Sequence, residues 1–113
     1  MTREEGSLKA EDLLRYISTL NLEETYQRIL SSIATPHDRM GLNIIHLKNM
    51  YSDLPEEKIK AILRDLRKQK HIRRAWNYEC RGDKLGGDRR IWYRVTNEFL
   101  DGAYVFIHGE SVF

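Results

Sequence analysis

The chain has 113 residues, of which 32% are charged and 41% hydrophobic, a balance typical of one folded globular domain. The longest uninterrupted apolar run, residues 103–107, is far shorter than the roughly 20 residues that span a bilayer, and charges begin at Arg3, so we expect neither a membrane partner nor secretion. Cys80 is the single cysteine and cannot form an intrachain disulfide, which favours a cytoplasmic protein, or a nuclear one in a eukaryote.

The formal net charge of +2 conceals an uneven distribution of charge along the chain. Residues 1–57 carry six basic and ten acidic residues, and residues 97–113 carry three acids and no base. Between them, residues 58–96 carry thirteen basic and four acidic residues. This basic block indicates a polyanionic partner, although a solvated surface rich in Lys and Arg would give the same pattern.

Apolar residues at three- and four-residue steps predict three helices in the first half of the chain. The first covers residues 8–20 with Ser7 as its N-cap, and the second ends before Pro36. A loop over residues 35–41 separates the second helix from the third. The candidate core positions of these helices are Leu13, Leu14, Ile17, Leu20, Leu22, Tyr26, Ile29, Leu30, Ile33, Ile44, Ile45, Leu47 and Met50.

The fourth helix, predicted over residues 55–70, has one apolar and one basic face. The apolar stripe comprises Ile59, Ile62, Leu63 and Leu66. The opposite face and its flanks comprise Lys60, Ala61, Arg64, Arg67 and Lys68. Glu56 and Glu57 occupy the first turn, where they favour the helix dipole but would repel phosphates.

The period of the apolar residues then changes from 3.6 to 2, which predicts two strands joined by a glycine-rich loop. The first strand covers residues 72–80, the loop residues 81–88 and the second strand residues 91–95. Alternation places Trp92 on the same face of this hairpin as Arg94, where it either packs on protein or stacks on a nucleotide.

Three short motifs resemble the winged helix-turn-helix superfamily over residues 22–96. They are Ile59-x-x-Ile62-Leu63-x-x-Leu66, Lys70-His71-Ile72 and Tyr93-Arg94-Val95-Thr96. His71 stands where that superfamily usually has a glycine in left-handed conformation. The segment 76–93 also resembles PadR-type regulators. The resemblance implies an α+β, mostly helical fold for this domain. The periodic first helix in residues 1–21 is then an addition to it, and the β-prone residues 103–108 predict a strand-like C-terminal extension in residues 97–113.

The same resemblance implies a small dimeric transcriptional regulator that binds double-stranded DNA sequence-specifically. The fourth helix would enter the major groove through Lys60, Ala61, Arg64, Arg67 and Lys68. Arg64 is best placed to contact a guanine edge. The hairpin would act as a wing that contacts DNA through Arg81, Lys84, Arg89 and Arg90.

Two alternatives to duplex binding stay open. A winged-helix protein–protein interaction module within a larger complex would explain Glu56, Glu57 and Trp92. An RNA-binding protein would instead use the aromatic side chains of the hairpin as stacking surfaces.

The terminal segments favour a homodimer, because the first helix needs a surface on which to bury its stripe and residues 103–107 read as an edge strand prone to pairing. The candidate interface residues are Leu13, Leu14, Ile17, Trp92, Val105 and Ile107. Alternatively, both extensions pack on their own domain.

Signatures of catalysis or metal binding are absent from the sequence. The four histidines lie far apart without metal-ligand spacing, and the hairpin glycines do not precede a helix as in nucleotide-binding loops. We therefore expect no enzyme, no catalytic residue, no metal and no cofactor.

Overall fold

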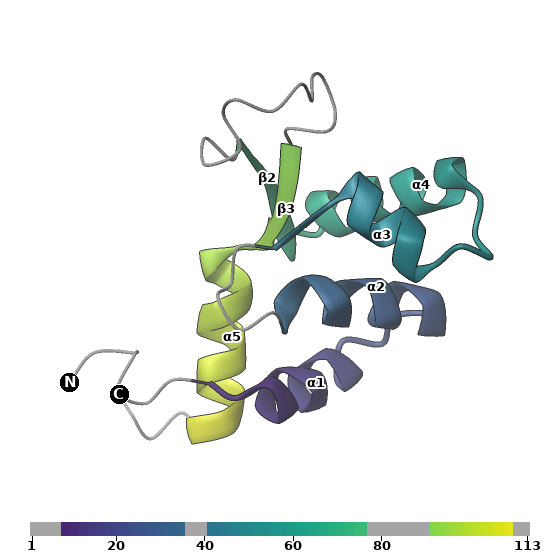
Figure 1. Ribbon diagram of the computed structural model, residues 1–113. Helices are drawn as coiled ribbons and strands as arrows, with labels where there is room; N and C mark the ends of the chain where they lie inside the picture. The colour runs from purple at the N-terminus through teal and green to yellow at the C-terminus, as the bar shows by residue number, and fades with distance from the viewer. Residues whose placement is uncertain (1–7, 36–40, 77–90, 110–113) are drawn as a thin grey trace.

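The computed structural model describes residues 8–35, 41–76 and 91–109, which form five α-helices and a small antiparallel sheet (Figure 1). The elements in chain order are α1 (Ala10–Ser18), α2 (Glu24–Ala34), β1 (Leu42–Asn43), α3 (Ile44–Met50), α4 (Glu56–Lys68), β2 (Ile72–Trp76), β3 (Ile91–Val95) and α5 (Asn97–His108). β3 is the central strand and pairs antiparallel with β1 and β2. The predicted α+β, mostly helical class is confirmed.

The helices predicted in the first half of the chain are present, with shorter bounds. The N-cap of α1 is Lys9 rather than Ser7, because the Asp12 carboxylate accepts a hydrogen bond from the backbone N–H of Lys9 and fixes the start of the helix there. Strand β1 was not predicted, since its two residues are too few to show a period. Gly41, directly before β1, has a φ of 86°, a backbone conformation that glycine adopts readily. A Cβ at this position would lie 2.0 Å from the carbonyl oxygen of Tyr93, so the close approach of the two strands also requires glycine.

Residues Asn97–His108 form helix α5, so the predicted strand-like extension is wrong in this part of the chain. Thr96 caps α5 by accepting a hydrogen bond from the N–H of Phe99 at 3.0 Å. Phe99 and Ala103 lie about one turn apart and are buried. Packing of this face overrides the β-propensity of residues 104–107, since strand preference depends strongly on tertiary context.

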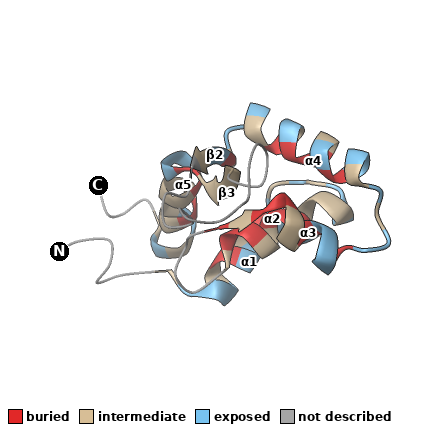
Figure 2. Ribbon diagram, turned by 45° about the horizontal axis from the view of Figure 1, so that its top comes forward, coloured by how far each residue is buried: buried red, intermediate tan, exposed pale blue. Residues whose placement is uncertain are grey.

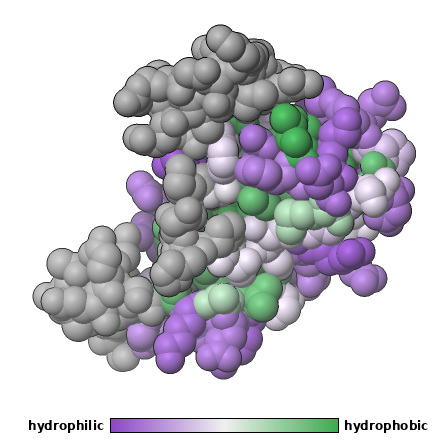
Figure 3. All heavy atoms as spheres, in the orientation of Figure 1, coloured by the Kyte–Doolittle hydropathy of each residue, from purple (hydrophilic) through white to green (hydrophobic). Residues whose placement is uncertain are grey.

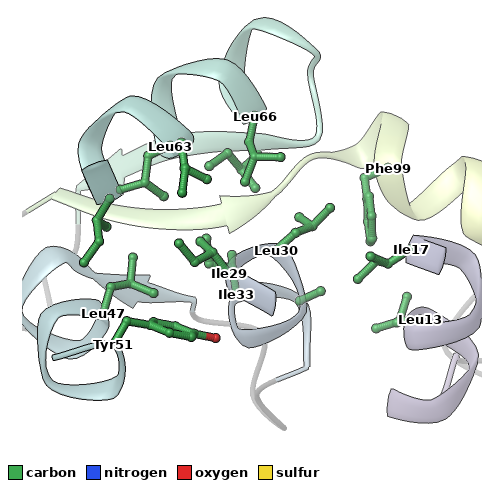
Figure 4. Close-up of a cluster of buried hydrophobic side chains, with 14 of the residues drawn as sticks. Leu13, Ile17, Ile29, Leu30, Ile33, Leu47, Tyr51, Leu63, Leu66 and Phe99 are labelled. Carbon is green, nitrogen blue, oxygen red and sulfur yellow. The ribbon is translucent and has the colours of Figure 1, made fainter. Parts of the chain in front are cut away.

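One hydrophobic core cluster joins all five helices and β2 (Figure 4). Ile29, Leu30 and Ile33 of α2 lie in its middle, between the side chains of α4 and those of α1. Its buried members are Leu13, Ile17, Ile29, Leu30, Ile33, Ala34, Ile44, Leu47, Tyr51, Ile59, Ile62, Leu63, Leu66, Ile72, Phe99 and Ala103. Two predicted core residues are instead exposed, Leu14 by 46% and Met50 by 52%.

The end of α4 is a left-handed turn at Lys70, one residue before the position that the sequence pattern indicated. Lys70 has a φ of 64°. Its N–H donates to the carbonyl oxygen of Arg67, and the N–H of His71 donates to that of Leu66, each at 3.0 Å. These two bonds satisfy the last carbonyl groups of the helix and turn the chain into β2.

Candidate nucleic-acid interface

Helix α4 lies at the edge of the molecule, with its buried residues toward the body and its exposed residues along the outer side (Figure 2). The predicted apolar stripe anchors it, because Ile59, Ile62, Leu63 and Leu66 are all at most 1% exposed. The amphipathic pattern therefore determines which side chains face the solvent.

The outer side of α4 carries Lys60, Arg64 and Lys68, which we call the α4 basic row. All three are exposed, and steps of four residues place them about 6 Å apart along the helix axis. Ala61 is half-buried, as is Arg67, whose Nε is buried without a hydrogen-bond partner among the described residues. Of the five predicted contact residues, the structure brings the basic row together on one surface and leaves these two at its margin.

The first turn of α4 carries two carboxylates with different surroundings. Oε1 of Glu56 lies 2.9 Å from Nζ of Lys48 on α3, and its Oε2 lies 3.1 Å from Nζ of Lys60. Hydrogen bonds from Lys48 and then from Lys60 lower the pKa of Glu56, so the carboxylate stays ionised and paired. Glu57 is exposed and forms no ion pair with any residue in the described part of the chain.

Hydrophilic side chains gather over the end of the molecule where α3 and α4 lie (Figure 3). Lys48 belongs to this surface with 49% of its side chain exposed. Lys48 was not a predicted contact residue, because it lies outside the basic block of the sequence and only the fold brings it to α4.

A polar contact beside the apolar stripe fixes the rotation of α4 on α2. The hydroxyl of Tyr26 donates a hydrogen bond of 2.5 Å to Oδ2 of Asp65. This hydrogen bond to Asp65 raises the pKa of the Tyr26 phenol. Since Asp65 lies next to Arg64, the contact also orients the middle of the basic row.

Tyr51, a buried residue that was not among the predicted core positions, fixes the turn that leads into α4. Its hydroxyl donates to the carbonyl oxygen of Arg28 at 2.8 Å and lies 2.5 Å from Oγ of Ser32. The guanidinium of Arg28 lies 5.2 Å from the centre of the Tyr51 ring. These contacts attach the end of α3 to α2 and so set where α4 begins.

The described part of the hairpin adds further positive charge. The register pairs Arg73 with Arg94, which places both side chains on one face of the sheet. On that face the rings of Trp92 and His46 pack edge-to-face at a centroid distance of 5.1 Å and an interplanar angle of 69°. The indole Nε1 of Trp92 is buried without a hydrogen-bond partner among the described residues. Trp92 therefore packs on its own domain. The predicted wing residues Arg81, Lys84, Arg89 and Arg90 lie outside the described residues.

The predicted dimer interface needs correction. Leu13 and Ile17 are each 1% exposed and belong to the core of their own chain, so they are not available to a partner. Leu14 is exposed, and Val105 and Ile107 on α5 are half-buried. Phe106 of α5, which was not among the predicted interface residues, is 46% exposed.

Two other kinds of feature are absent from the described ranges. No group of three or more His, Cys, Asp or Glu residues in them is arranged to hold a metal ion. No helix in them is long and apolar enough to cross a membrane.

Comparison with known proteins gives no match to any family model, and no similar protein among the curated proteins or the solved structures.

Proposed function

We propose that residues 22–96 form a winged helix-turn-helix domain that binds double-stranded DNA through α4, as a small transcriptional regulator. The order of the elements supports this proposal, since α2, α3 and α4 are followed by an antiparallel strand pair. In this arrangement α4 takes the place of the recognition helix and the β2–β3 hairpin that of the wing.

The observation that carries the proposal is the α4 basic row on the outer side of a rigidly packed helix. An α-helix fits the major groove, and cations along its outer side reach phosphates and base edges. Arg64 lies in the middle of the row, where a guanidinium can donate two hydrogen bonds to one guanine. The stripe below it is buried on α2 and α3, so the row is presented without further folding.

The ion pairs of Glu56 reduce the electrostatic repulsion between the first turn of α4 and DNA. Lys48 and Lys60 both form ion pairs with the Glu56 carboxylate and partly neutralise its charge. The first turn of α4 therefore repels phosphate less than it would if both of its carboxylates were unpaired. Glu57 still presents a negative charge at this end, which favours an approach centred on the later turns of the helix.

We further propose that the protein binds DNA as a homodimer whose contact includes α5. Exposed Phe106 and half-buried Val105 and Ile107 give this helix apolar area beyond what its own domain covers. A two-fold dimer would present two copies of α4 to one duplex. Sedimentation velocity over a series of micromolar concentrations tests the proposed dimer. A dimer is expected, and a monomer at every concentration would contradict the proposal.

A protein–protein interaction module is the second candidate function. Met50 at the end of α3, 52% exposed, and the exposed Glu57 of α4 present an apolar and an acidic side chain to solvent, which suits a protein partner better than DNA.

Fluorescence anisotropy with matched duplex DNA, single-stranded DNA and RNA separates these functions. DNA binding predicts saturable binding of the duplex at micromolar protein in low salt, with weaker binding of both single strands. Tighter binding of the single-stranded probes than of the duplex would instead support an RNA-binding function. No binding to any of the three, together with a stoichiometric protein partner in an affinity purification, would support the interaction module.

A further inference from the structure

Glu56 sits between two ammonium groups that come from different helices. Each carboxylate oxygen forms an ion pair with one of them: Oε1 pairs with Lys48 of α3 and Oε2 pairs with Lys60 of α4. The side chains of Lys48, Glu56 and Lys60 are 49%, 41% and 44% exposed, so all three are open to solvent. The carboxylate is thus an exposed anion between two cations, one from α3 and one from α4.

The two lysines suit a phosphodiester as well as a carboxylate. Both groups present two anionic oxygens on one central atom, and the ammonium of lysine binds phosphate as a point charge. Lys60 also belongs to the α4 basic row, so a phosphate at this position would lie beside the surface that the proposed function assigns to DNA.

We propose that Lys48 and Lys60 form a binding site for one backbone phosphate of DNA and that Glu56 occupies this site in the free protein as an intramolecular competitor. This inference rests on the proposed function. Exposed ion pairs are individually weak, so a phosphate within a polyanion displaces the carboxylate at modest cost. Because phosphate contacts carry no sequence information, Glu56 lowers the affinity for all duplexes alike and limits non-specific binding.

The test is Glu56→Gln, which keeps the length of the side chain and removes its charge. Its matched control is Glu57→Gln, because Glu57 is the adjacent exposed acid and forms no ion pair with a described residue. Both variants and the wild type are titrated against a mixed-sequence duplex over a series of salt concentrations. A thermal melt of each variant checks that it is folded.

Glu56→Gln is expected to bind the duplex about two- to fivefold more tightly, the range of one exposed ion pair. The plot of log K against log salt should steepen by up to about 0.9, for one more phosphate contact. Glu57→Gln should change the affinity less. Lys48→Ala, which leaves Glu56 in place, should weaken binding about two- to fivefold.

Equal gains for Glu56→Gln and Glu57→Gln would overturn the inference, because only net charge would then matter. Unchanged affinity in both Glu56→Gln and Lys48→Ala would overturn it as well, while the duplex binding of the wild type would leave the proposed function standing. Absence of duplex binding by the wild type and all variants would reject the proposed function and the phosphate site together.

Discussion

The hydroxyl of Thr96 donates a hydrogen bond to the carbonyl oxygen of Lys70, 26 residues earlier in the chain. The hydroxyl oxygen of Thr96 also accepts a hydrogen bond from the N–H of Phe99 at 3.0 Å, and the N–H of Thr96 donates to the carbonyl oxygen of His71 at 3.1 Å. One buried residue therefore joins the turn that ends α4 to the start of α5. Thr96 thus connects the proposed DNA-contacting helix, α4, to the proposed dimerisation helix, α5, by hydrogen bonds.

Thr96→Ala should lower the free energy of unfolding by about 1–3 kcal/mol, because it removes the cap of α5 and leaves the Lys70 carbonyl without its donor. Urea unfolding followed by circular dichroism measures the loss. Thr96→Ser retains the hydroxyl and should cost less than half as much. Equal losses in the two variants would show that the methyl group, and not the hydrogen bonds, stabilises this junction.

Lys70→Gly should raise the free energy of unfolding by roughly 0.5–1 kcal/mol, because relief of the left-handed backbone outweighs the added freedom of the unfolded chain. The control is Gln69→Gly, since Gln69 has a φ of −84° that any residue adopts. That variant should lose stability in the same urea experiment. A stabilised Gln69→Gly or a destabilised Lys70→Gly would contradict the assigned geometry of this turn.

Gly102→Ala should destabilise the protein by about 1–3 kcal/mol, although alanine normally favours a helix over glycine. A Cβ at this position would lie 2.2 Å from the hydroxyl oxygen of Tyr16 and 3.0 Å from its Cζ. The Tyr16 ring cannot easily withdraw, because Phe99 and Phe106 contact it at centroid distances of 5.2 and 5.8 Å.

Tyr16→Leu in the Gly102→Ala background should recover part of that loss, since it removes the atoms that the new methyl meets. A double-mutant cycle by chemical denaturation measures the recovery. Strict additivity of the two single changes would contradict the close packing of α1 on α5.

His71 should make stability depend on pH near neutrality. Burial lowers the pKa of its imidazole below the usual value of 6.5. The unfolded state then binds a proton more readily than the folded state, so the free energy of unfolding is highest above pH 6.5 and decreases as the pH falls below that value. Urea unfolding at about pH 7.5 and about pH 5.5 should show this decrease, and His71→Gln should reduce it. The same decrease in both proteins would assign the effect to other groups.

The features that sequence alone predicts well are those with a strong local period. The stripe from Ile59 to Leu66 determines both the extent of α4 and the exposure of Arg64, and the alternation around Tyr93 determines the strand pair. The composition of the C-terminal segment predicted a strand, because Val105 and its aromatic neighbours favour extended structure wherever tertiary packing does not decide.

Contacts between distant segments were not predictable, because no local pattern encodes them. Lys48 reaches Glu56 only after the turn at Tyr51 brings α3 against α4. The burial of Leu13 and Ile17 likewise depends on the packing of α1 against both α2 and α5, which no pattern within the first helix encodes.

The salt dependence of duplex binding measures most directly whether the α4 basic row contacts phosphates. Arg64→Ala/Lys68→Ala removes two of its cations, while the control Lys9→Ala/Arg15→Ala removes one Lys and one Arg that are exposed on or beside α1. The slope of log K against log salt should fall in magnitude by up to about 1.8 in the α4 variant, or about 0.9 per lost phosphate contact, and stay unchanged in the control. An unchanged slope in the α4 variant, or an equal fall in the control, would contradict DNA binding through α4.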